Sequence, residues 1–121
     1  MVMEDKRYWY DATVVKVIDG DTVDVRIDPG LDLEVRMRCR LYGINTPELR
    51  GVTKAAGMRA REQLKQWLKE AADKNGRVVC RTVKDRRDKY GRYLIEFFLR
   101  DGRSINQELV AGGFAVDYML D

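Results

Sequence analysis

The stretch TVDVRIDPGLDLEVRMRCRL, residues 22–41, decides the fold, because apolar and polar residues alternate along both of its halves. The apolar positions of this alternation are Val23, Val25, Ile27, Leu33, Val35, Met37, Cys39 and Leu41. A period of two is typical of β-strands with one face toward a core, and Asp28-Pro29-Gly30 is a turn signal between them. The stretch therefore predicts two strands, with the apolar set facing a core and the arginines facing outward.

The flanking segments predict further strands. Residues 8–18 are rich in aromatic and β-branched residues and end at Asp19-Gly20, which predicts a hairpin with residues 22–28. Residues 78–83 and 92–99 have the same character and are separated by a polar loop. The sequence thus predicts five short strands.

Two segments predict helices. In residues 54–74 apolar side chains recur at spacings of three and four, which is typical of an amphipathic helix, and Asn75-Gly76 is expected to end it. Ser104 and Gln107 form a capping-box pattern for a short helix that continues through Val110 and stops at Gly112-Gly113. Five strands with a helix between the third and fourth match an OB-type order. We therefore expect a mainly β fold of the α+β class, a five-stranded OB-type β-barrel with two or three helices.

Composition limits the domain organisation. A chain of 121 residues with 45% hydrophobic content is long enough for one core, and it contains no repeat or linker, so residues 1–121 are expected to form a single domain. The net charge is only +3, but residues 77–92 carry seven basic and two acidic residues. This local excess suits a polyanion, although a solvated surface would have the same pattern.

The residue types that are rare or missing exclude several kinds of chemistry. The chain has no histidine, so phosphate chemistry would need carboxylates and a hard cation. Its two cysteines, Cys39 and Cys80, are expected to be buried free thiols, with a disulfide as the alternative. The first residues lack the apolar run of a signal peptide, and no stretch is long enough to span a membrane. A cytoplasmic location is favoured, with a secreted form whose signal was removed as the alternative.

Two acidic segments are candidates for metal chemistry. Asp19 and Asp21 flank Gly20, and two carboxylates this close are stabilised by a cation or a basic partner, although an ordinary hairpin turn would also explain them. In the segment 45–48, Asn-Thr-Pro-Glu, proline favours an extended Thr46, which can direct its carbonyl and the Glu48 side chain into one cavity. A strand-terminating turn is the simpler interpretation of this segment.

Two arginines are candidates for phosphate binding. Arg40 precedes Asn45 by five residues on the outward side of its strand, and Arg92 opens the last strand. A guanidinium group donates paired hydrogen bonds to phosphate oxygens and stays charged at any relevant pH. Either residue alone would be interpreted as an ordinary surface arginine.

Taken together, these segments resemble the thermonuclease family, the staphylococcal nuclease-like enzymes. The resemblance rests on Val17-Ile18-Asp19-Gly20-Asp21-Thr22, on Arg40 before Asn45-Thr46-Pro47-Glu48, and on Asp88-Lys89-Tyr90-Gly91-Arg92, and it extends from about Ala12 through Ala115. It implies a calcium-dependent, sequence-nonspecific nuclease that hydrolyses phosphodiester bonds of DNA and RNA to 3'-phosphate products. A monomer and no membrane partner are expected.

The resemblance also implies a role for each site residue. Ca²⁺ would be bound by Asp21, Asn45 and the Thr46 carbonyl, with Asp19 as a nearby carboxylate. Glu48 would act as general base, Arg40 and Arg92 would hold the scissile phosphate, and Lys89 and Tyr90 would contact a neighbouring phosphate. Tyr118 is a candidate for stacking on a base, with a core or surface tyrosine as the alternative.

The chain departs from the family pattern at Asn45, where the family has aspartate. An amide oxygen can bind calcium, but affinity falls as the charge of the ligands falls. A noncatalytic nucleic-acid-binding or protein-interaction module of the same fold is therefore the alternative function. Retention of Glu48, Arg40 and Arg92 favours the enzyme, because a binding module needs no general base.

Overall fold

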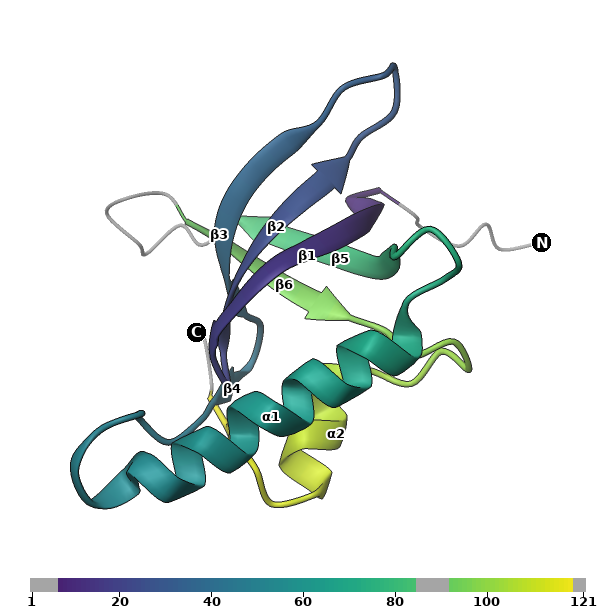
Figure 1. The fold of residues 1–121 in the computed structure, drawn as a ribbon. Helices are drawn as coiled ribbons and strands as arrows, with labels where there is room; N and C mark the ends of the chain where they lie inside the picture. The colour runs from purple at the N-terminus through teal and green to yellow at the C-terminus, as the bar shows by residue number, and fades with distance from the viewer. Residues whose placement is uncertain (1–6, 85–91, 119–121) are drawn as a thin grey trace.

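The computed structural model describes residues 7–84 and 92–118 (Figure 1). Five strands form a closed barrel, and two α-helices lie at one end of it. In chain order the elements are β1 (Trp9–Asp19), β2 (Thr22–Asp28), β3 (Val35–Leu41), β4 (Ile44–Asn45), the 3₁₀ turn η1 (Gly51–Thr53), α1 (Lys54–Ala71), β5 (Val78–Lys84), β6 (Tyr93–Phe97), α2 (Ile105–Ala111) and β7 (Val116–Asp117).

The barrel has the strand order β1-β2-β3-β6-β5, and it closes because β5 also pairs with β1. Four of its strand pairs are antiparallel, whereas β3 and β6 run parallel, with Arg40 aligned with Leu94. α1 connects β4 to β5 and carries the chain from one side of the barrel to the other (Figure 1). The predicted OB-type α+β fold is confirmed.

Alternation along the strands places one apolar set inside the barrel. The fully buried side chains include Val23, Val25, Cys39, Leu41, Cys80, Ile95 and Phe97 from the strands, and Leu64, Ile105 and Leu109 from the helices. Burial of each large aliphatic or aromatic side chain contributes about 1.5–3 kcal/mol. The cysteines are confirmed as buried free thiols, and burial raises the pKa of each to about 12. None of the helices in the described part of the chain combines the length and apolar character that a membrane crossing requires.

Two sequence expectations are wrong at the tip of the β2–β3 hairpin and at the end of α1. Leu33 and Val35 are exposed instead of facing the core, because this hairpin extends beyond the part of the barrel that the helices cover (Figure 1). α1 ends at Ala71, before the expected Asn75-Gly76. Asp73 accepts backbone hydrogen bonds from Asn75 (2.8 Å) and Arg77 (2.9 Å), and this local turn competes with helix continuation.

α2 begins where its sequence predicts. Its position is stabilised by the buried Asn106, a residue that the sequence pattern did not single out. The Ser104 hydroxyl accepts a hydrogen bond from the Gln107 amide (3.2 Å). Asn106 is fully buried and donates to the carbonyls of Tyr42 and Ile95, both at 3.0 Å, while it accepts from the Phe97 amide (3.2 Å). A buried amide is stable only when it is hydrogen-bonded, so Asn106 holds α2 against the chain that follows β3.

Candidate active site

The β1–β2 turn and the segment that follows β3 meet at one end of the barrel. The Leu41 amide donates to the Asp21 carbonyl (2.7 Å), and the Thr46 amide donates to Asp21 Oδ2 (3.1 Å). Arg40 is the last residue but one of β3, so it arrives at the same place. The structure therefore brings together the predicted site residues Asp21, Arg40, Asn45 and Thr46.

Asp21 is the central carboxylate of this cluster. Its side chain is only 15% exposed, and its Oδ1 accepts a hydrogen bond from the Thr22 hydroxyl (3.3 Å). Asp19 lies beside it, because Asp19 Oδ1 accepts from the Asp21 amide (3.0 Å). Burial, followed by the hydrogen bond and the charge of Asp19, raises the pKa of Asp21, and the effects of Thr46 and Arg40 do not cancel this.

The raised pKa of Asp21 predicts how stability depends on pH. Between the ordinary aspartate value of 3.8 and the higher folded value, the folded state holds a proton that the unfolded chain has released. The free energy of unfolding therefore falls as the pH rises through this range and stays lower at neutral pH. We expect Asp21→Asn to melt at a higher temperature than the wild type at pH 7 without metal, and we expect this difference to vanish near pH 3.

Thermal melts from pH 3 to 7 in the presence of chelator measure this effect, and Asp24→Asn is the matched control. The Arg38 hydrogen bond lowers the pKa of Asp24, so its carboxylate stabilises the fold above the unfolded pKa and this stability is lost as the pH falls. Asp24→Asn should lower the melting temperature at pH 7. A lower melting temperature for Asp21→Asn as well would show that the Asp21 charge stabilises the fold.

Arg40 contacts several members of the cluster. Its Nη2 donates to the Ile44 carbonyl (3.0 Å) and to the Asn45 side-chain oxygen, and it lies 3.9 Å from Asp21 Oδ2. Its guanidinium carbon is 4.9 Å from the centre of the Tyr118 ring. Tyr118 is placed there because its amide donates to the Gly43 carbonyl (2.8 Å), next to the β4–β7 pair. Tyr118, predicted as a base-stacking residue, is thus in contact with the site through Arg40.

Two glycines allow the site to pack against α1, and sequence reasoning gave neither of them this role. A Cβ at Gly20 would lie 2.7 Å from Thr46 Oγ1 and 2.9 Å from the Ala60 Cβ. A Cβ at Gly57 would lie 2.7 Å from the Glu48 carbonyl oxygen and 2.8 Å from that of Pro47. Only glycine permits such close approaches. A glycine inside an amphipathic helix pattern, as at position 57, is the signal that could have indicated the contact.

Glu48 lies in the segment between β4 and η1, and its side chain faces solvent. Its side chain is 71% exposed, and its Oε2 is 3.2 Å from Arg50 Nε. Its backbone is held more firmly, because the Thr53 hydroxyl donates to the Glu48 carbonyl (2.9 Å). The carboxylate is thus accessible to water and substrate, but its ion pair directs it toward Arg50.

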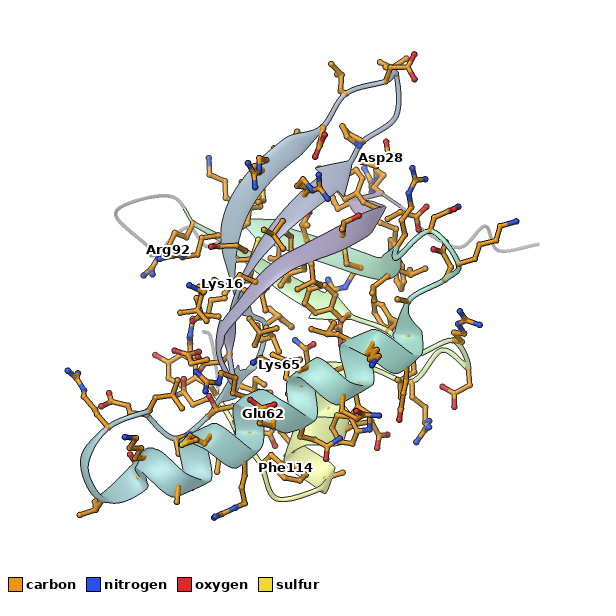
Figure 2. All side chains as sticks on the ribbon, viewed as in Figure 1. Lys16, Asp28, Glu62, Lys65, Arg92 and Phe114 are labelled. Carbon is orange, nitrogen blue, oxygen red and sulfur yellow. The ribbon has the colours of Figure 1, made fainter. Side chains whose placement is uncertain are left out.

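Arg92 enters from the neighbouring strand. It is exposed, and the parallel register places it two residues before Leu94, the partner of Arg40. Figure 2 shows its side chain projecting from the barrel at the start of β6. Lys89 and Tyr90, predicted to contact a neighbouring phosphate, lie outside the described residues.

Some of the oxygen atoms in the cluster are suitable ligands for a hard cation, and others are already engaged. Two carboxylates lie side by side at Asp19 and Asp21, and burial, together with the neighbouring Asp19, raises the pKa of Asp21. The Asn45 amide oxygen, in contrast, accepts from Arg40. Within residues 7–84 and 92–118, no three Cys, Asp or Glu side chains are grouped for metal binding. A cation here would therefore use amide or carbonyl oxygens besides the two aspartates.

Comparison with known proteins places the chain in a family. Residues 38–121 match the family described as staphylococcal nuclease homologue. The chain is 32% identical to an uncharacterized endonuclease of Escherichia coli O157:H7, over 87% of this chain and 59% of that protein. It is 30% identical to the uncharacterized protein MJ1439 of Methanocaldococcus jannaschii, over 95% of this chain and 62% of that protein. Endonuclease YhcR of Bacillus subtilis is 25% identical, over 92% of this chain and 9% of that protein.

The chain therefore spans about three fifths of two of these relatives and a small part of the third. The matched region begins at Arg38, so it includes Arg40, Asn45, Glu48 and Arg92 but not Asp21. The endonuclease names of two relatives support a nuclease-like function. By its fold and by the match over most of its length, this chain belongs to the staphylococcal nuclease homologue family.

Proposed function

We propose that this chain is a calcium-dependent, sequence-nonspecific nuclease that hydrolyses phosphodiester bonds of DNA and RNA to 3'-phosphate products. The observation that carries the proposal is the convergence of Asp21, Arg40, Asn45 and Thr46, where acidic oxygens and a guanidinium group lie together. Such a site can bind a phosphate and a hard cation at the same time. A bound Ca²⁺ would be held by Asp21, Asn45 and the Thr46 carbonyl, supported by Asp19, and would polarise a phosphoryl oxygen.

The protein groups would divide the chemistry among them. The exposed Glu48 carboxylate would accept a proton from the attacking water, after leaving Arg50. Arg40 and Arg92 would donate hydrogen bonds to phosphate oxygens and stabilise the charge that develops as the bond to the 5' oxygen breaks. Because a guanidinium group keeps its protons at any relevant pH, the proton for that oxygen would come from water.

A cleavage assay tests this function. Plasmid, single-stranded DNA and RNA would each be incubated with calcium, magnesium or chelator and separated on gels. We expect cleavage of all three substrates with calcium and none with chelator, since every proposed ligand is an oxygen atom. Full cleavage after thorough metal removal would contradict the mechanism.

A noncatalytic nucleic-acid-binding or protein-interaction module of the same fold is the second candidate. Two observations favour it: the Asn45 amide oxygen is bound by Arg40, and the Glu48 carboxylate is paired with Arg50. Binding of nucleic acid without cleavage under any metal condition would support this alternative.

Asn45 provides a direct test of the metal site. Asn45→Asp adds a formal charge beside Asp21, and we expect calcium to bind about tenfold more tightly, equivalent to about 1.4 kcal/mol. The new carboxylate would also attract Arg40, which opposes this gain. Calorimetric titration with calcium measures the affinity. Asn75→Asp makes the same charge change in an exposed turn and is the control. Equal affinities of the two variants would place residue 45 outside the metal site.

A further inference from the structure

A second feature of the barrel is a cavity of about 580 Å³ at the end away from the helices. Figure 1 shows α1 and α2 at one end of the barrel and the β2–β3 hairpin extending from the other. The cavity lies between the base of this hairpin, the start of β1, the end of β5 and the start of β6. It is lined by Ile27, Pro29, Val35 and Met37 from the hairpin side, and by aromatic and basic residues from the other strands.

Three tyrosines, Tyr8, Tyr10 and Tyr93, line the cavity. Tyr10 and Tyr93 are partly buried against the core, whereas Tyr8 is 62% exposed. Tyr8 also has a positive φ of 69°, which is uncommon for a residue with a side chain, and its carbonyl accepts a hydrogen bond from the Thr82 amide (3.0 Å). The pairing with β5 therefore holds an exposed aromatic ring at the rim of the cavity.

The charged residues that line the cavity are basic. They are Arg7, Arg81 and Lys84, and no acidic side chain lines it among the residues that the structure describes. Arg81 is paired with Glu96 at 2.9 Å, and the exposed Lys84 adds positive charge at the cavity. Aromatic rings beside positive charge suit a ligand that has a flat aromatic group and a phosphate, which is the chemistry of a nucleotide.

The cavity lining reaches the residue next to Arg92 in the chain. Tyr93 directly follows Arg92, and it pairs across the β5–β6 ladder with Lys84. A nucleic-acid strand whose phosphate is held by Arg92 has Lys84 and Tyr93 within reach of a neighbouring nucleotide, because both lie one ladder position from Arg92. Bases in a duplex are paired and stacked on one another, so only an unpaired base is free to enter.

We propose that this cavity binds an unpaired nucleotide of a nucleic-acid strand next to the cleaved phosphate, with its base against Tyr8 and its phosphate near Lys84. The inference rests on the proposed nuclease function and adds a preference for single-stranded substrate. It accounts for an exposed aromatic ring held in an uncommon backbone conformation at the rim of the cavity. A free mononucleotide has the same aromatic base and phosphate, so the test must distinguish it from a nucleotide within a strand.

Fluorescence anisotropy in the presence of chelator measures binding without cleavage. The probes are a labelled oligothymidylate and a labelled blunt-ended duplex of two complementary strands, with thymidine 5'-monophosphate as competitor. Base–aromatic stacking contributes enough that Tyr8→Gly should weaken binding of the oligothymidylate by about fivefold or more. Tyr8→Phe keeps the ring and should bind it as the wild type does. Neither substitution should change binding of the duplex.

Tyr8→Gly suits the positive φ, so the variant should fold, and a thermal melt checks this. Leu31→Gly is the matched control, because Leu31 also has a positive φ (58°), is 91% exposed and lies outside the cavity lining. Unchanged oligothymidylate binding by Tyr8→Gly, or an equal loss of duplex binding, would overturn the inference. Mononucleotide binding as tight as that of the oligomer would overturn it in favour of a free nucleotide. An inactive enzyme that shows the expected binding pattern would contradict the proposed nuclease function alone.

Discussion

Glu48→Gln is expected to lower the turnover of phosphodiester cleavage by about 10²–10⁴-fold, because the amide cannot accept the proton of the attacking water. The melting temperature should hardly change, since the Glu48 side chain is 71% exposed and its ion pair with Arg50 lies at the surface. Turnover at saturating substrate and thermal melts measure the two quantities. A loss of turnover without a loss of stability would show that Glu48 takes part in the chemical step and does not merely support the fold.

Glu34→Gln is the matched control for this prediction. Glu34 is also an exposed glutamate paired with an arginine, and its distance to Arg26 is 3.2 Å, as in the Glu48–Arg50 pair. It lies in the turn that leads to β3, away from the site. Wild-type turnover of Glu48→Gln would remove Glu48 from the mechanism and favour the noncatalytic module.

Arg92→Lys and Arg40→Lys are expected to lower turnover by about 10²–10³-fold each, because an ammonium group cannot reproduce the paired hydrogen bonds of a guanidinium group. The two variants should differ in stability. Arg40 binds Ile44 and Asn45 and contacts the Tyr118 ring, so Arg40→Lys should also lower the melting temperature, whereas Arg92 is exposed. Kinetics and thermal melts of both variants separate phosphate binding from support of the site.

Arg38→Lys is the control for the arginine variants. Arg38 lies on the same strand as Arg40 and donates two hydrogen bonds to Asp24, at 2.8 and 3.2 Å, on the outer surface of the barrel. Its replacement should leave turnover unchanged. If both Arg40→Lys and Arg92→Lys keep full turnover, a positive charge alone is sufficient at both positions, and paired hydrogen bonds to the phosphate are not required.

The sequence by itself determined the order of the main strands and helices and the candidate residues of the site. Thr22–Asp28 forms a strand with the expected bounds, because alternation with a period of two exposes one face and buries the other within a few residues. The Ser104 cap is equally local, since its partner is three residues away. Asp21, Arg40 and Asn45 were candidates because the motifs that contain them resemble those of the thermonuclease family, and the structure brings them together.

Only the tertiary structure decided how the site residues contact one another and what surrounds them. Arg40 meets Tyr118, which is 78 positions later in the chain, because Gly43 and Tyr118 are joined by a hydrogen bond beside the β4–β7 pair. Gly20 and Gly57 are required by contacts with Thr46 and Glu48, and Leu33 is exposed although its alternation predicts burial. The physical reason is that barrel closure and helix packing join segments far apart in the sequence, and local periodicity contains no information about which surfaces meet.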